Sequence, residues 1–200
     1  MPIENGEHAM KPMKPARPIA LAALCLFAGT ASAHSGSHAL AGFAGGLTHP
    51  LQGLDHLLAM IVVGLWAAQQ GGRARWAVPA AFVAAMELGA VLAWMGGELP
   101  QVETAIALSV LALGLLAATR RQWTVPAGMA VAAVFALFHG HAHGLEMPQA
   151  ASPALYALGF VLATIFLHGV GIAGSLAGRR AVQVAGTSIA TAGLALIFAT

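Results

Sequence analysis

Charged residues and cysteine are scarce in this sequence of 200 residues. Only 8% of the residues are charged and 58% are hydrophobic, whereas about a quarter of the residues in an average soluble domain are charged. No stretch of mixed polarity is long enough to form a second, aqueous domain, and the nine lysine and arginine residues form no patch of the kind that binds nucleic acid. The composition therefore predicts one membrane domain with no nucleic-acid partner.

Two motifs that would indicate ATP-driven or hydrolytic chemistry are also missing. The sequence has no glycine-rich loop followed by Lys and Ser or Thr, the pattern that holds the phosphates of ATP. It also lacks the His-Glu-x-x-His pattern of many zinc hydrolases. We therefore expect that the protein is not an enzyme and does not use ATP directly.

Residues 1–33 have the three parts of a secretory signal peptide. A basic segment precedes an apolar run at 19–31 that is too short to span a bilayer comfortably, and the small residues around Ala33 form a cleavage site. Cleavage there would make His34 the new N-terminus and would remove Cys25, the only cysteine. The predicted organisation is a signal peptide at 1–33 and a membrane domain at 34–200.

Six apolar segments follow, each long enough to cross a hydrocarbon core of about 30 Å as a helix. They do not alternate between polar and apolar residues, as the strands of a membrane barrel would. The expected fold is therefore an all-α polytopic membrane protein with six transmembrane helices, at residues 50–69, 76–95, 100–118, 125–144, 153–176 and 181–199.

The basic residues predict the orientation of these helices. After residue 33 the chain has six arginines, all in the first, third and fifth connections between predicted spans. The second and fourth connections contain Glu98 and Glu146 and no basic residue. Because loops rich in basic residues stay in the cytoplasm, we expect a multi-pass protein of the bacterial inner membrane with both mature termini in the periplasm.

Histidines and acidic residues gather near the predicted periplasmic face. Charged groups inside a bilayer cost about 2.5–3.5 kcal/mol on insertion scales, so they usually face a cavity or one another. In the first span His49 and His56 are seven residues apart and are expected on one helical face. Asp55 is expected either to ligate a metal ion or to orient an imidazole on a neighbouring helix.

The fourth span ends with three histidines in five residues. His139, His143 and Glu146 are expected to share a helical face, with His141 on the other side. At a rise of about 1.5 Å per residue, His139 is expected at the same depth in the membrane as Asp55 and His56 of the first span. One site built from both helices is therefore predicted.

Four further residues extend this prediction. His34 and His38 follow the cleavage site and are expected either to capture a metal ion or to form only a polar flank. Glu87 in the second span and His168 in the fifth are expected either to continue a polar path towards the cytoplasm or to bond to neighbouring helices. The third and sixth spans contain almost no ionisable residue and are expected to serve as scaffold.

Imidazole and carboxylate groups without a thiolate favour borderline divalent ions such as nickel, cobalt, zinc or copper(II). The stretches 49–56 (His-Pro-Leu-Gln-Gly-Leu-Asp-His) and 138–146 (Phe-His-Gly-His-Ala-His-Gly-Leu-Glu) resemble the two signatures of the HupE/UreJ family, and the resemblance extends over the whole mature chain. It implies a secondary permease for Ni²⁺, sometimes Co²⁺, that supplies hydrogenase or urease maturation. The metal is then the transported ion and not a prosthetic group. The transport residues that the resemblance implies are His49, Asp55, His56, His139, His141, His143 and Glu146.

Two alternatives remain open at this point. One is an intramembrane metal-dependent hydrolase, since clusters of histidine and carboxylate also build zinc sites. The other is a non-transporting accessory protein that docks a metal chaperone or an enzyme at the membrane. Assembly into a homo-oligomer is compatible with all three interpretations.

Overall fold

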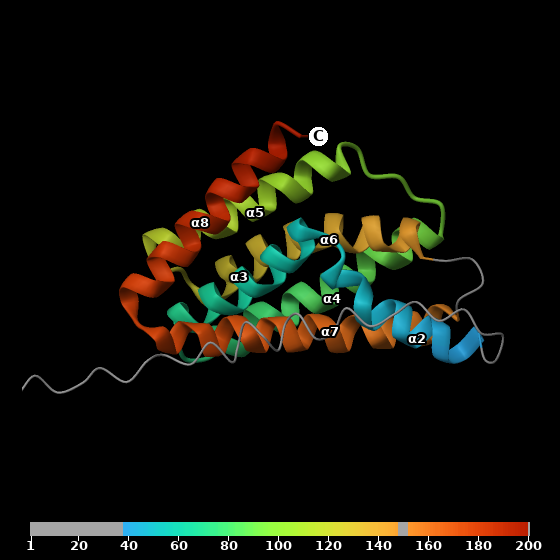
Figure 1. The fold of residues 1–200 in the computed structure, drawn as a ribbon, viewed down its shortest axis with the longest axis horizontal. Coiled ribbons are helices and arrows are strands. Elements are labelled where there is room, and N and C mark those ends of the chain that lie inside the picture. Colours follow the sequence, from blue (N-terminus) through green and yellow to red (C-terminus); the bar gives the residue numbers. More distant parts are fainter. Residues whose placement is uncertain (1–37, 148–151, 200) are drawn as a thin grey trace, which may run out of the picture. The chain divides into compact units, whose positions relative to one another are not determined.

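The computed structural model describes residues 38–147 and 152–199, and every regular element within these ranges is helical. The predicted signal peptide and His34 lie outside the described residues. Seven α-helices and two 3-10 turns follow one another along the described chain (Figure 1): α2 His38–Thr48, η1 His49–Leu51, α3 Leu54–Gln70, α4 Ala74–Trp94, α5 Val102–Thr119, α6 Val125–Glu146, α7 Pro153–Gly174, η2 Ser175–Ala177 and α8 Arg179–Ile197.

Five of these helices, α4 to α8, are long and apolar enough to cross a membrane. A sixth span results only if the bent pair Gly42–Leu51 and Leu54–Gln70 is counted as one. For the described residues this confirms an all-helical chain with five to six candidate membrane spans.

The first span departs from the sequence prediction. The apolar pattern predicts one continuous helix over 50–69, but α3 begins at Leu54, and the helical segment before it is bent away by 79°. Pro50 lies in η1, and Gly53 is extended with φ −104° and ψ 122°. Proline lacks a backbone donor and glycine favours non-helical conformations, so both residues interrupt the helix. The expectation that His49 and His56 share one helical face is therefore wrong, and α2 is a helix that the pattern did not predict.

Close approach of backbones holds the helices in pairs. Helix α4 packs against α6, α5 against α8, and α7 against both α2 and α3. A Cβ added at Gly64 of α3 would overlap the backbone of His168 in α7, and one at Gly171 of α7 would overlap the backbone of Ile61 in α3. Such glycines let helices in lipid approach closely enough for dense van der Waals contact. The pairing fixes the relative register of α3 and α7.

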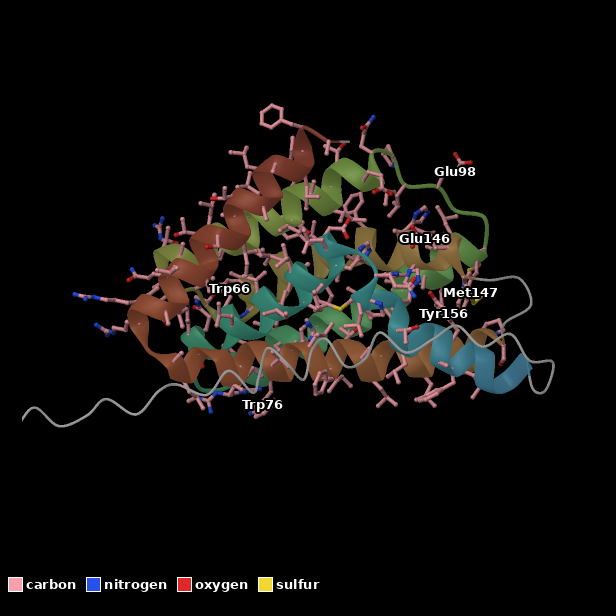
Figure 2. All side chains as sticks on the ribbon, in the orientation of Figure 1. Trp66, Trp76, Glu98, Glu146, Met147 and Tyr156 are labelled. Atoms are coloured by element: carbon pink, nitrogen blue, oxygen red, sulfur yellow. The ribbon has the colours of Figure 1, made fainter. Side chains whose placement is uncertain are left out.

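The connections between helices fall at two opposite ends of the bundle. At one end Gln70 Nε2 donates to the carbonyl of Arg121 at 3.0 Å, which ties the end of α3 to the α5–α6 connection. At the other end His141 Nε2 lies 2.9 Å from the carbonyl of Gly97, which ties the end of α6 to the α4–α5 connection. Figure 2 shows Glu98 and Glu146 towards this second end. The arginine-bearing connections therefore lie opposite the histidine-bearing end.

Candidate metal site

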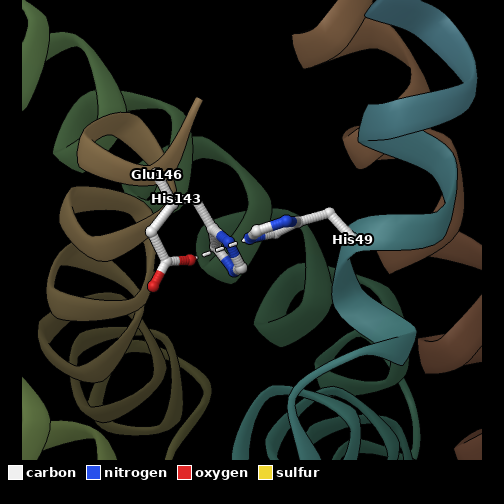
Figure 3. A group of neighbouring side chains, drawn as sticks. All are labelled: His49, His143 and Glu146. Carbon is white, nitrogen blue, oxygen red and sulfur yellow. Dashed lines mark hydrogen bonds and ion pairs between the residues drawn. The ribbon is translucent and has the colours of Figure 1, made fainter. Parts of the chain in front are cut away.

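The outermost part of the site joins the turn η1 to the end of α6. His49 Nε2 lies 2.9 Å from Glu146 Oε2, and the ring centroid of His143 is 4.7 Å from that of His49. One ligand atom from each of the three residues lies within 4.8 Å of the other two, and the three side chains point toward one another in Figure 3. His143 is buried, whereas His49 and Glu146 are partly exposed. We call these three residues the rim group, and their geometry suits one divalent ion.

Deeper in the site Asp55 orients an imidazole, but it is that of His56 on its own helix and not, as expected, one on a neighbouring helix. Asp55 Oδ1 accepts a hydrogen bond from the backbone N–H of His56 and lies 2.8 Å from His56 Nδ1. An ionised carboxylate can only accept, so His56 carries its proton on Nδ1. The opposite nitrogen, Nε2, is buried without a hydrogen-bond partner in the described residues. Carboxylate–histidine pairs of this kind orient the ligands of many metal sites.

Gly53 leaves the space that this pair occupies. A Cβ at Gly53 would stand 2.7 Å from Asp55 Oδ1 and 3.0 Å from His56 Nδ1. Gly53 is also the residue that precedes the first turn of α3. The break in the first span and the orientation of His56 therefore depend on the same residue.

His139 of α6 faces His56, and their ring centroids are 4.9 Å apart. His139 Nε2 lies 2.7 Å from Ser109 Oγ, and that hydroxyl donates to the carbonyl of Ile106 at 2.7 Å. Because a hydroxyl has a single proton, His139 donates its Nε2–H to Ser109. Its Nδ1 then keeps a lone pair and is buried without a partner in the part of the chain that the structure describes.

Ser109 is a residue that the sequence analysis missed. It lies on α5, which was expected to be scaffold, and its side chain is fully buried. A single serine in an apolar helix carries no recognisable signal in sequence, because its role depends on the neighbouring helix.

His143 connects the rim group to the inner histidines. Its ring centroid is 4.1 Å from that of His56 and 4.0 Å from that of Phe160 in α7. Neither of its ring nitrogens has a hydrogen-bond partner among the described residues. An unpartnered buried polar group costs about 1–3 kcal/mol, and a bound cation would remove that cost. We call His56, His139 and His143 the inner group.

His141 is a predicted ligand that belongs to neither of these groups. His141 points to the other side of α6, as the helical spacing predicts, and its Nε2 lies against the Gly97 carbonyl. Its side chain is thus engaged in joining α6 to the α4–α5 connection. His38 begins α2, but its side chain is not among those that the structure describes.

The two deeper predicted residues differ in how they lie relative to the inner group. The ring of Phe82 lies 5.9 Å from that of His139 and 5.3 Å from that of His168, so one aromatic side chain neighbours both imidazoles. His168 is buried, and both of its ring nitrogens are without a partner in the described chain. Glu87 is half-buried and lines a small crevice beside His143.

A cavity of about 360 Å³ borders the rim group and His56 of the inner group. Its lining contains three histidines and three carboxylates, with the residues His49, Gln52, Gly53, Asp55, His56, Glu103, His143 and Glu146. Glu103, in the first turn of α5, is an acidic residue that the sequence analysis did not select. Carboxylates around a cleft raise the local concentration of cations, so the cavity can concentrate cations beside the histidines.

The fold and the site together define a polytopic helical membrane protein with a histidine–carboxylate cluster at one end. The family model described as HupE / UreJ protein matches residues 22–196. The chain is also 48% identical over 182 residues to Protein HupE of Rhizobium leguminosarum bv. viciae, an alignment that covers 88% of this chain and 94% of that protein. The chain therefore belongs to the HupE/UreJ family, which confirms the resemblance of its two motifs. A comparison with solved structures finds no match.

Proposed function

We propose that this protein is a secondary permease that carries a divalent transition metal ion, Ni²⁺ or Co²⁺, from the periplasm across the inner membrane to the cytoplasm. The observation that carries this proposal is the convergence of buried imidazole nitrogens without partners, on His56, His139 and His143. Neutral imidazole together with carboxylate suits borderline divalent ions. The arginine-bearing connections then face the cytoplasm, in agreement with the positive-inside rule.

The ion moves between the two groups through a shared ligand. It is collected in the cavity by the carboxylates and binds first at the rim group, where Glu146 and His49 are partly exposed. His143 belongs to both groups, so the ion can exchange the two outer ligands for His56 and His139 while His143 stays bound. Each step replaces one ligand by another, which avoids the large cost of a bare charge in the membrane.

The membrane potential is sufficient to drive this transport. Two positive charges that enter down about 100 mV gain about 4.6 kcal/mol, which corresponds to a concentration ratio on the order of 10³. Uptake therefore needs neither ATP nor a second ion. The imported metal would serve the maturation of a hydrogenase or a urease, in keeping with the family to which the chain belongs.

Radioactive nickel uptake in cells without their own nickel transporters tests the proposal. His143→Ala should lower the initial rate at least about tenfold, whereas His141→Ala, two residues away and outside both groups, should change it less than about twofold. Both variants are compared at equal amounts of inserted protein. Wild-type uptake no faster than that of cells without the protein would refute the permease, and equal rates in both variants would refute the assignment of the site.

A further inference from the structure

Three helices contribute further potential ligand atoms below the histidines. Met60 of α3, Met86 of α4 and Thr164 of α7 are all fully buried. Thr164 Oγ1 lies 3.5 Å from Met60 Sδ and 3.9 Å from Met86 Sδ. We call these residues the thioether group.

The thioether group has more acceptors than donors. The single hydroxyl proton of Thr164 has a stronger acceptor than sulfur in the carbonyl of Phe160, 2.9 Å away. With the proton directed to Phe160, the Thr164 oxygen and the two nearby sulfur atoms have no proton to share between them. That arrangement suits a cation.

Helical register places Met60 and Thr164 at a level between the inner histidines and His168. In α3, Met60 follows His56 by one turn, and in α7, Thr164 follows Phe160 by one turn and precedes His168 by one. Residues four apart share a helical face, and successive turns are about 5.4 Å apart. An ion that leaves the inner histidines towards His168 therefore passes this level.

We propose that Met60, Met86 and Thr164 form a transient binding site for the transported cation, between the inner group and His168. This inference rests on the proposed permease function. Thioethers are neutral, soft ligands, so they hold Ni²⁺ or Co²⁺ less firmly than imidazole and release it readily. The unbranched methionine side chain adapts its shape easily, which lets the two sulfur atoms follow the ion as it moves.

Nickel flux into proteoliposomes tests this site. The double variant Met60→Leu with Met86→Leu removes both sulfur atoms at nearly constant volume, and Thr164→Val removes the hydroxyl at nearly constant shape. Each should lower the maximal rate at least about fivefold, while the half-saturating nickel concentration, which the outer histidines set, should change less than about twofold.

Two matched controls separate ligand loss from packing. Met129→Leu changes a partly exposed methionine of α6 and should leave the rate unchanged. Thr164→Ser keeps the hydroxyl and should transport faster than Thr164→Val. If the double variant is not recovered folded, the comparison of Thr164→Val with Thr164→Ser decides. Equal maximal rates of nickel flux in these two variants would overturn the proposal.

The outcomes also distinguish this proposal from the permease function. Wild-type maximal rates in the double variant and in Thr164→Val would overturn the thioether site and leave the permease intact. No nickel flux through the wild-type protein would overturn both.

Discussion

Asp55→Asn keeps the size of the side chain but removes the charge beside His56. In the wild-type protein the carboxylate fixes the proton of the imidazole on Nδ1, through a contact of 2.8 Å. An amide can instead turn its NH₂ group towards Nδ1, which moves the ring proton to Nε2, the nitrogen left free for a metal ion in the wild-type protein. Loss of such a partner typically costs about 10–100-fold in metal affinity, or about 1.4–2.8 kcal/mol.

Calorimetric titration of the purified protein with Ni²⁺ measures this loss, and NMR of nitrogen-labelled histidine reports which ring nitrogen of His56 is protonated. We expect weaker binding together with a shift of the proton to Nε2. Glu98→Gln makes the same change of charge at an exposed position of the same end of the bundle and should bind nickel as the wild-type protein does. Wild-type affinity in Asp55→Asn, or weaker binding without a change of tautomer, would refute this role.

The remaining predictions concern helix packing, His139 and pH. Gly171→Ala places a Cβ in the backbone of Ile61 and should destabilise the protein by about 1–3 kcal/mol in an unfolding assay. In Gly169→Ala the new Cβ meets nothing within 4 Å, and stability should change by less than about 0.5 kcal/mol. Equal losses of stability in the two variants would contradict the close approach of α3 and α7 at Gly171. Ser109→Ala leaves Nε2 of His139 without its partner and should cost about 1–3 kcal/mol of stability and weaken nickel binding; unchanged melting and affinity would contradict that hydrogen bond. Nickel uptake should weaken in acid, since protons compete with the metal for imidazole nitrogens, and an uptake rate that stays constant with pH down to the point of acid unfolding would count against imidazole ligands.

Much of the helical architecture was predictable because it depends on composition and on local periodicity. Long apolar segments with turn-forming residues between them predict spans, and five of the six expected spans correspond to single helices. The first span was misjudged because Pro50 at the start of an apolar run suits the first turn of a helix as well as a break. Only the extended conformation of Gly53 shows that the helix breaks here instead of starting at Pro50. The absence of a side chain at Gly53 also makes room for Asp55 and His56.

The site was predictable in part for the same reason. The spacing of four residues along one helix places His139 and His143 on one face and His141 on the other, whatever surrounds them. The contact of His49 with Glu146 joins residues 97 positions apart, and no helical periodicity predicts such a pair. Its formation depends on the bend before α3 and on how that bend meets the end of α6.

The sequence by itself determined that this chain is an apolar helical protein, to which family it belongs, and which histidines and acids share a helical face. These properties follow from the composition, from the motifs and from the 3.6-residue period of the helix. The tertiary structure alone decided that Ser109 supports His139, that Phe82 neighbours two imidazoles, and that Met60, Met86 and Thr164 meet. Serine, phenylalanine, methionine and threonine are ordinary residues of an apolar helix. Their chemistry here arises only from the atoms that other helices place beside them.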